Sequence, residues 1–205
     1  MKTEADFAII GGGIVGLSVA HGLLKKGYSV ICIDGSDTDF RASRGNFGLV
    51  WVQGKGIKAP FYAAWTQNAA RLYPDFVSEL SQETGVQINF NQVGGYEYFT
   101  EPHVLSQRME EYKQLKKALN GDYPYEFLSS TEIRSAEPMV AGETVGASFY
   151  PHDGHLNPLQ LLKALASYCH KKGLSHYLGE ELEVADKKEG VFKLVTKKGL
   201  TISAS

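Results

Sequence analysis

Cysteine is scarce in this chain of 205 residues, and the two cysteines, Cys32 and Cys169, lie far apart. Their spacing fits neither a metal-binding pair nor a redox pair, which argues against a disulfide scaffold and favours a reducing compartment. An excess of positive charge is also absent, because 21 Lys and Arg residues stand against 23 Asp and Glu residues. A formal net charge of −2 argues against a nucleic-acid-binding protein, which usually carries a strong basic excess.

The sequence has no hydrophobic run long enough to suggest a membrane span near its start. The apolar stretch 7–20 is interrupted by glycines and is too short to cross a bilayer. Acidic residues precede it, where a secretory signal would carry basic ones. We therefore expect a soluble, cytoplasmic protein, and peripheral attachment at the inner face of the membrane stays an open alternative.

Several catalytic signatures are missing as well. The sequence contains no Gly-x-Ser-x-Gly, His-Glu-x-x-His or phosphate-loop lysine motif, so nothing in it supports a hydrolase or an NTPase. His152 and His155 flank Asp153, but no third ligand cluster accompanies them, and we interpret this segment as a turn before a helix. We expect no metal site. With 43% hydrophobic residues the chain has the composition of a folded globular protein.

The N-terminal segment has the pattern of a strand, a turn, a helix and a second strand. The apolar run 7–10 is typical of a buried parallel strand, and glycines occupy 11–13. A helical pattern covers 14–26 and stops at Gly27, and a second strand covers 28–33. The segment 7–33 is therefore predicted to be a βαβ unit.

The turn of this unit carries the spacing Gly11-x-Gly13-x-x-Gly16, which is typical of dinucleotide-binding sites. Gly11 permits the tight turn, Gly13 lets the backbone approach a pyrophosphate, and Gly16 lets the helix pack on the strand. Asp34 follows the second strand and is placed to accept hydrogen bonds from ribose hydroxyls. The motif favours a nucleotide with a free 2′-hydroxyl, but its physics alone does not separate FAD from NAD.

The remainder of the chain alternates helical and strand patterns. Trp51 and Trp65 are interpreted as core residues, and Tyr96 and Tyr98 share one face of a strand, where they are candidates for contact with a substrate. Gly154 is assigned to a turn, and Asn157 caps a helix with proline at its first position. The expected elements are a helix over 58–84 that Pro74 interrupts or kinks, strands over 86–90 and 96–99, helices over 104–119 and 130–136, a strand over 147–150, a helix over 157–172, and an antiparallel hairpin over 179–199.

Two further segments carry a family resemblance. They are Ala42-Ser-Arg-Gly-Asn-Phe-Gly-Leu-Val-Trp51 and Asp153-Gly-His-Leu-Asn-Pro158. Together with the N-terminal βαβ unit, they resemble the flavoenzymes of the D-amino-acid oxidase superfamily, which includes the glycine oxidases. Within it, the stretch 46–53 looks most like the catalytic subunits of opine oxidases, hydroxyproline dehydrogenases and hydrogen cyanide synthase. The resemblance covers the whole chain but is sharp only in these three segments.

The resemblance implies FAD as the cofactor and suggests how this chain would bind it. The glycine turn would hold the pyrophosphate, Asp34 the adenosine ribose, and the loop after it the phosphate and flavin-ring side. Asp34 is one methylene shorter than the glutamate that the family more often has. The cofactor-binding residues implied are Gly11, Gly13, Ile14, Val15, Gly16, Asp34, Gly35, Ser43, Arg44, Asn46, Phe47, Gly48 and Leu49, with Leu182 and Val184 near the adenine.

The resemblance also implies an α/β fold, in which a Rossmann-like FAD-binding domain carries an inserted α+β substrate domain. We expect FAD-binding segments at 1–84 and 151–205 and the substrate domain at 85–150, with the chain covering about half of such an enzyme. The implied activity is oxidation of the CH–NH bond of a small amino or imino acid, such as a D-amino acid, glycine, sarcosine, hydroxyproline or an opine-like compound.

Oxygen or a quinone would accept the electrons, and partner subunits or a homo-oligomer are expected. No catalytic residue is assigned, because the family's substrate clamp lies in the other half. Two alternatives stay open. One is a fragment or subunit that binds FAD without turnover, and the other is an NAD-dependent dehydrogenase.

Overall fold

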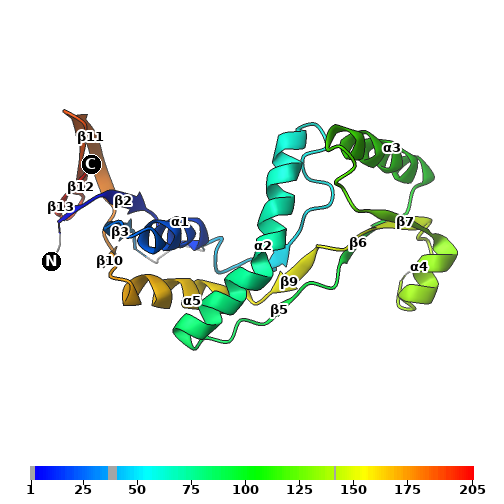
Figure 1. The fold of residues 1–205 in the computed structure, drawn as a ribbon, viewed down its shortest axis with the longest axis horizontal. Helices are drawn as coiled ribbons and strands as arrows, with labels where there is room; N and C mark the ends of the chain where they lie inside the picture. The colour runs from blue at the N-terminus through cyan, green and yellow to red at the C-terminus, as the bar shows by residue number, and fades with distance from the viewer. Residues whose placement is uncertain (1–2, 37–40, 141) are drawn as a thin grey trace. The chain divides into compact units, whose positions relative to one another are not determined.

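The chain divides into two compact units, and each is described by itself below. The computed structural model describes residues 3–36, 41–140 and 142–205 (Figure 1). Unit 1 comprises Met1–Phe47, Val77–Asn89 and Asn157–Ser205, and unit 2 comprises Gly48–Phe76 and Phe90–Leu156. These units are defined by packing, whereas the boundaries expected from the sequence were drawn by function. The functional division therefore stays a prediction.

Unit 1 is built on a parallel sheet whose strand order is β10-β3-β2. Strand β2 (Phe7–Ile10) and strand β3 (Val30–Asp34) are joined by helix α1 (Ile14–Lys25). Helix α5 (Pro158–Lys171) leads into β10 (Ser175–Leu178), which pairs in parallel with β3. The βαβ unit that the glycine turn indicates is thus confirmed.

Helices α1 and α5 lie side by side (Figure 1). Leu17 and Ala20 of α1 and Leu165 and Cys169 of α5 are all buried, and the Cys169 Sγ lies 3.6 Å from the Leu17 carbonyl oxygen. The side chain of Asn157 accepts hydrogen bonds from the first backbone N–H groups of α5, as the sequence predicts for an N-cap.

A second sheet in unit 1 packs against the parallel one. Its order is β1-β13-β12-β11, and β11 and β12 form the antiparallel hairpin that the sequence predicts. Ile31 and Ile33 of β3 form a buried cluster with Leu194 and Ile202 of this sheet. Because side chains alternate along a strand, Cys32 faces the opposite side, toward the helices. The strands are β1 (Glu4–Ala5), β11 (Leu182–Lys188), β12 (Val191–Thr196) and β13 (Thr201–Ala204).

Unit 2 contains two small antiparallel sheets, with orders β4-β9-β5 and β6-β8-β7. Helix α2 (Pro60–Thr84) begins in unit 2 and ends in unit 1. No helix in the described part of the chain is long and apolar enough to cross a membrane. The remaining elements are β4 (Leu49–Val50), β5 (Phe90–Asn91), β6 (Gly95–Phe99), α3 (Pro102–Ala118), β7 (Glu126–Ser129), α4 (Ser130–Ala136), β8 (Gly146–Tyr150) and β9 (Gly154–Leu156).

Tyrosines form much of the core of unit 2. Tyr112, Tyr123 and Tyr150 are fully buried, and their rings meet in sequence at centroid distances of 5.4 and 5.1 Å. The buried Gln67 amide donates to the Tyr150 hydroxyl at 2.7 Å, which satisfies a polar group that burial would otherwise penalise. Buried aromatic rings therefore contribute much of the apolar area in this core.

Asp153 joins three segments of unit 2 between β8 and β9. It is fully buried, and its Oδ1 accepts a hydrogen bond from the Val52 N–H. Its own carbonyl oxygen accepts from the Gly94 N–H at 3.0 Å. Burial raises the pKa of Asp153 to about 6, and the Val52 N–H partly offsets this rise. The residue thus has a structural role within the segment that carries the resemblance.

The strand expected over 86–90 is largely wrong, because only Phe90–Asn91 pairs in a sheet. The backbone before it bonds to the start of α5 instead. The Asn89 N–H donates to the Gln160 side chain, and the Asn89 carbonyl accepts from the Asn157 N–H. Hydrogen bonds to Asn157 and Gln160 therefore take the place of the strand pairing that the apolar pattern predicted.

The helix expected over 58–84 is confirmed and continues through Pro74, but the core role assigned to Trp65 is wrong. Trp65 is 70% exposed, because the buried side of α2 in unit 2 carries small or polar side chains such as Ala63 and Gln67. Gly154 is not a turn residue either, since it lies in β9. A Cβ there would approach the Asn91 carbonyl oxygen to 2.4 Å, so close strand contact explains this glycine.

Two glycines of α1 give a matched test of the turn. A Cβ on Gly16 would lie 1.9 Å from the Gly11 carbonyl oxygen, whereas a Cβ on Gly22 would meet nothing within 4 Å. We expect Gly16→Ala to lower the free energy of unfolding by about 3 kcal/mol or more, because backbone must move. Gly22→Ala should raise it by about 0.5–1 kcal/mol. Urea denaturation of both variants measures this, and equal effects would contradict the packing role of Gly16.

Asp153 predicts a pH dependence of stability. Its folded pKa is raised above the ordinary carboxyl value, so the folded state binds more protons between about pH 4 and pH 6. The contribution of Asp153 to stability should therefore fall by about 3 kcal/mol as the pH rises through that window. Asp153→Asn keeps an acceptor for Val52 and removes the titration, so it should gain stability relative to the wild type as the pH rises.

The exposed Asp75 provides the control for this measurement. Asp75→Asn removes an exposed carboxylate from the part of α2 in unit 2, so it measures the general effect of losing one surface charge. Denaturation curves at a series of pH values compare the three proteins. A constant difference between wild type and Asp153→Asn over the whole range would show that Asp153 does not titrate as its burial indicates.

Candidate functional site

The glycine turn between β2 and α1 forms the centre of the candidate site in unit 1. Gly11 has φ of 100° and its N–H donates to the Ile33 carbonyl at 2.8 Å, which ties the turn to the end of β3. Gly13 is the N-cap of α1 and supplies no side chain there. The first N–H groups of α1 and the positive end of its dipole are thus directed at this turn, an arrangement suited to an anion.

The conformations of these glycines match the roles that their spacing predicts. The positive φ of Gly11 and the close approach of Gly16 to the Gly11 carbonyl require residues without side chains. A Cβ on Gly13 would lie 2.9 Å from the Ser43 Oγ. The structural roles of Gly11 and Gly16 are confirmed, whereas contact with a pyrophosphate stays a prediction.

A cavity of about 480 Å³ lies along this turn. Ser43 closes one side, and its hydroxyl accepts a hydrogen bond from the Ile14 N–H at 3.0 Å. Val15 is 73% exposed beside it. The lining residues are Ala8, Ile9, Ile10, Gly11, Gly13, Ile14, Val15, Gly16, Val19 and Ser43. Six of the residues that the resemblance assigns to the cofactor, including Ser43, therefore line one cavity.

Asp34 lies at the carboxyl end of β3, as its place in the sequence predicts. Its Oδ1 accepts from the Arg41 Nη1 at 2.9 Å, and Arg41 also donates to the Ser36 carbonyl at 2.7 Å. Next to it, a Cβ on Gly35 would lie 3.1 Å from the Glu181 Cγ. The sequence reasoning missed Arg41, although a basic residue seven positions after the acid was a signal that could have been considered.

Residues 41–46 are held by hydrogen bonds to their own backbone carbonyls. The Asn46 amide donates to the Ala42 and Ser43 carbonyls at 3.3 and 3.1 Å, and the Arg44 N–H donates to the Arg41 carbonyl. Phe47 is 91% exposed. These residues lie in unit 1, whereas Gly48 and Leu49, assigned to the same function, lie in unit 2, where Leu49 begins β4. Their contacts with a flavin stay predictions.

Leu182 and Val184 lie at the start of β11, where the pairing with β12 shifts register. A bulge of this kind redirects the strand and leaves a residue outside the regular ladder. Leu182 packs on the cluster of Ile31 and Ile33, while Val184 is 49% exposed. The contact of their backbone with an adenine stays a prediction.

Tyr96 and Tyr98 share one face of β6 in unit 2, as alternation predicts. Their rings stack with centroids 6.0 Å apart, and Tyr96 also packs on Phe149 at 5.0 Å. Tyr98 is 46% exposed, and its pKa is raised by burial and by nearby Glu137. The hydroxyl therefore stays protonated at neutral pH and can donate a hydrogen bond to a ligand.

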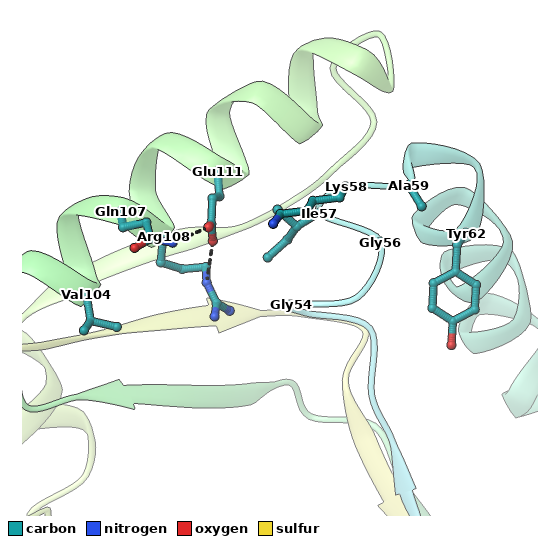
Figure 2. Close-up of a pocket in the computed structure, with 10 residues that line it drawn as sticks. All are labelled: Gly54, Gly56, Ile57, Lys58, Ala59, Tyr62, Val104, Gln107, Arg108 and Glu111. Carbon is teal, nitrogen blue, oxygen red and sulfur yellow. Dashed lines mark hydrogen bonds and ion pairs between the residues drawn. The ribbon is translucent and has the colours of Figure 1, made fainter.

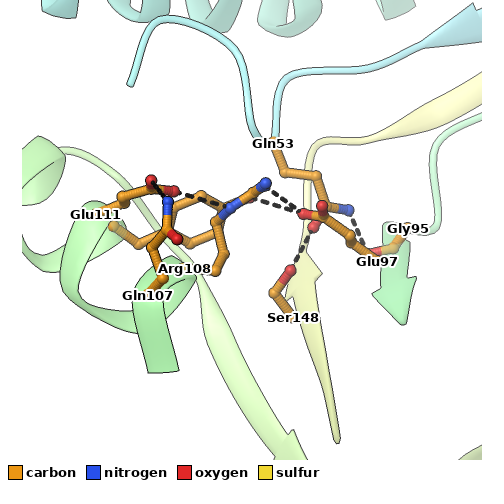
Figure 3. Close-up of polar contacts among 8 residues, drawn as sticks. Gln53, Gly95, Glu97, Gln107, Arg108, Glu111 and Ser148 are labelled. Carbon is orange, nitrogen blue, oxygen red and sulfur yellow. Dashed lines mark hydrogen bonds and ion pairs between the residues drawn. The ribbon is translucent and has the colours of Figure 1, made fainter. Parts of the chain in front are cut away.

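Unit 2 also has a cavity of about 450 Å³ between α3 and the loop that precedes α2 (Figure 2). Arg108 donates to Glu97 at 2.6 Å and to Glu111 at 3.1 Å. Nearby, the buried Gln53 donates to the Gly95 carbonyl and accepts from Ser148 (Figure 3). Because these polar groups bond to one another, they support the sheet of β6 and do not require a ligand.

His176 is a site residue that the sequence reasoning missed. It lies in β10, opposite Cys32 in the register with β3. Its Nδ1 and Nε2 are buried and find no hydrogen-bond partner among the described residues. Burial lowers the pKa of His176, nearby His170 lowers it further, and Asp34 opposes both. Only the parallel pairing of β10 with β3 brings this residue to the turn, so no local signal could have shown it.

The residues present fit a dinucleotide at this place. The glycines leave a cradle that a Cβ would fill at Gly13, and the first turn of α1 offers backbone N–H groups to phosphate oxygens. The carboxylate at the end of β3 can accept from ribose hydroxyls. In the described residues no group of three or more His, Cys, Asp or Glu side chains is placed to bind a metal ion.

Comparison with known proteins gives a family match over almost the whole chain. The model of the DAO family, described as FAD dependent oxidoreductase, matches residues 6–204. One of the subunits of opine oxidase from Rhizobium meliloti is 37% identical over 174 residues, which are 84% of this chain and 47% of that protein. Glycine oxidase of Bacillus subtilis is 25% identical over 166 residues, which are 80% of this chain and 42% of that protein.

The fold agrees with solved structures of similar proteins. The crystal structure of glycine oxidase from Geobacillus kaustophilus superposes with a TM-score of 0.88 at 24% identity, covering 99% of this chain and 54% of that one. The chain thus spans about half the length of the curated relatives and solved structures to which it is similar. The glycine cradle and the family match lead to one conclusion: the chain belongs to the DAO family of FAD-dependent oxidoreductases.

Proposed function

We propose that this chain forms the FAD-binding part of an oxidoreductase that oxidises the CH–NH bond of a small amino or imino acid. The observation that carries the proposal is the cradle at the β2–α1 turn, where Gly13 leaves room above the first N–H groups of α1 and Asp34 ends β3. The family membership supports FAD over NAD as the nucleotide. When bound, the flavin supplies the hydride-accepting chemistry, and the protein supplies position and electrostatics.

The substrate class is proposed from the names of the relatives. They include a glycine oxidase, a dimethylglycine dehydrogenase and one of the opine oxidase subunits, all of which are named for amines that carry a carboxylate or derive from amino acids. Tyr96 and Tyr98 are the residues of this chain that we assign to the substrate, because their stacked face is partly exposed and Tyr98 can donate a hydrogen bond.

We place the protein in the cytoplasm, with oxygen or a quinone as the electron acceptor.

A second candidate function is a subunit that binds FAD without turnover by itself. The relative from Rhizobium meliloti favours this candidate, because it is named as one of the subunits of opine oxidase, which implies partner chains in that protein. We propose that partner subunits complete the site in this protein as well. Turnover of the chain alone, assayed with glycine, sarcosine, D-hydroxyproline and several D-amino acids and an artificial electron acceptor, would contradict this second candidate.

The choice of nucleotide has a direct test in the absorption spectrum of the purified protein. Wild-type protein incubated with FAD and passed through a desalting column should keep the flavin bands in the near-UV and blue. Gly13→Val should lose them, because its side chain would occupy the approach of the pyrophosphate and press on the Ser43 hydroxyl. Circular dichroism should show an intact fold, since Gly13 has φ of −76°, which a valine can adopt.

Gly22→Ala is the matched control, because it adds a side chain to α1 without touching the turn. It should keep as much flavin as the wild type. Flavin bound by Gly13→Val at the wild-type stoichiometry would show that the site is elsewhere. A wild-type protein that retains NAD and no flavin would favour the alternative function of an NAD-dependent dehydrogenase.

The tyrosine face gives a separate prediction for the complete enzyme, reconstituted with its partner subunits. Tyr98→Phe removes one hydrogen-bond donor and keeps the stacked ring, so the KM for the amine substrate should rise about tenfold, since such a bond is worth about 1–1.5 kcal/mol. FAD retention by the chain should not change. Steady-state kinetics measures both constants, and an unchanged kcat/KM would remove Tyr98 from the substrate site.

A further inference from the structure

His176 is half-buried, but both of its ring nitrogens are buried and have no assigned role in the structure. Neither ring nitrogen has a hydrogen-bond partner among the described residues, although both are shielded from water. Leaving polar atoms in this state costs free energy, and native proteins rarely tolerate it away from functional sites. A leucine or valine would pack in a strand of a parallel sheet without that cost. The position therefore needs a reason beyond packing.

The location of the ring supplies that reason. The Nε2 lies 2.7 Å from the point that a Cβ of Gly12 would occupy, in the middle of the glycine turn. The Asp34 Oδ2 lies 3.1 Å from the same point. The imidazole and the carboxylate thus converge on the underside of the turn, at the end of β3 where the ribose of a dinucleotide is expected.

The two oxygens of Asp34 differ in their surroundings. The Oδ1 accepts from the Arg41 guanidinium at 2.9 Å, whereas the Oδ2 is directed to the side of Gly12 and His176. No hydrogen bond to the Oδ2 from a described residue is found in the structure. This oxygen is therefore the one available to a ribose hydroxyl. The protonation state of the His176 imidazole determines whether the oxygen stays available.

We propose that His176 is a positioning residue of the nucleotide site that acts through Asp34. In its neutral form the imidazole leaves the Oδ2 of Asp34 to the ribose of FAD. In its protonated form the imidazolium pairs with that oxygen and competes with the ribose. The proposal rests on the proposed function, since it assumes that the glycine cradle binds FAD.

The groups around His176 determine the direction of the effect. Its pKa is lowered by burial and by His170 of α5, while Asp34 of β3 raises it. The neighbouring thiols of Cys32 and Cys169 stay neutral, because burial raises their pKa values to about 12 and about 11. His176 is therefore neutral above pH 7. Because bound FAD would occupy the Oδ2, FAD should lower the pKa of His176 further. The affinity for FAD should therefore fall as the pH drops below the pKa of His176 in the FAD-free chain.

The test is the pH dependence of FAD binding to the wild-type chain and to His176→Gln. Glutamine keeps a neutral hydrogen-bonding group and cannot titrate. Titrations followed by quenching of flavin fluorescence should give similar Kd values at about pH 8, where the imidazole is neutral. As the pH falls below about 6.5 and the imidazole becomes protonated, the wild-type Kd should rise, by up to about tenfold for each unit by which FAD lowers the pKa of His176. The Kd of His176→Gln should change by less than about threefold.

His170→Gln is the matched control. It removes the neighbouring imidazole, whose ring centroid lies 5.5 Å from that of His176, without removing the group that faces Asp34. This variant should keep a pH-dependent Kd, with the transition shifted to higher pH because His170 no longer lowers the pKa of His176. Histidine NMR gives a readout independent of affinity, because FAD should lower the pKa of the His176 imidazole in the wild-type chain. Thermal unfolding without FAD confirms that each variant is folded.

The outcomes separate the two proposals. A wild-type chain that binds FAD with the same pH dependence as His176→Gln overturns the role of His176 and leaves the proposed function intact. Failure of the wild type to bind FAD at any pH overturns the proposed function and this inference with it. If His176→Gln does not fold, His176→Asn takes its place, and the NMR titration of the wild type decides the question by itself.

Discussion

The approach of α1 to the turn before it is the constraint on which the rest of unit 1 depends. Because Gly16 has no side chain, the first turn of α1 lies against the Gly11 carbonyl, where a Cβ would come within 1.9 Å. This contact fixes the helix relative to β2 and β3 and directs its N–H groups at the cavity beside Ser43. Helix α5 packs on α1, and the chain then enters β10 beside β3. The position of His176 below Gly12 is thus a consequence of the same glycine contact.

The polar network around Arg108 in unit 2 and the pair of Asp34 and His176 in unit 1 differ in how their polar atoms are bonded. In unit 2, Arg108 bonds to two carboxylates, and Gln53 joins the Gly95 backbone to Ser148. That network is satisfied and holds the sheet whose other face carries the stacked tyrosines. In unit 1, the imidazole of His176 finds no partner in the described residues, beside a carboxylate held by one oxygen only. A protein tolerates such groups where a ligand changes their surroundings.

Sequence reasoning worked where the determining interactions are local. The cap at Asn157 depends on the residues that follow it, the hairpin of β11 and β12 on one short turn, and the βαβ unit on the glycine motif between its strands. The structure has all three. Predictions from the sequence failed where segments distant in the chain determine the local structure. The large apolar side chains of α2 in unit 2, such as Trp65, are exposed because the buried side accommodates only small residues and a hydrogen-bonded Gln67. The residues 86–89 bond to the start of α5 instead of a strand.

The sequence by itself determined the nucleotide-binding character of the chain, because a glycine spacing and an acid after the second strand depend only on local backbone geometry. The resemblance of two further segments added the flavin family. Only the tertiary structure decided how Asp34 is held and which residue faces it. Arg41 reaches the carboxylate through the fold of its loop, and His176, far along the chain, reaches it through the pairing of β10 with β3. Parallel strands that no single helix crossover joins, such as β3 and β10, can lie at any separation in the chain, so their pairing cannot be derived from spacing.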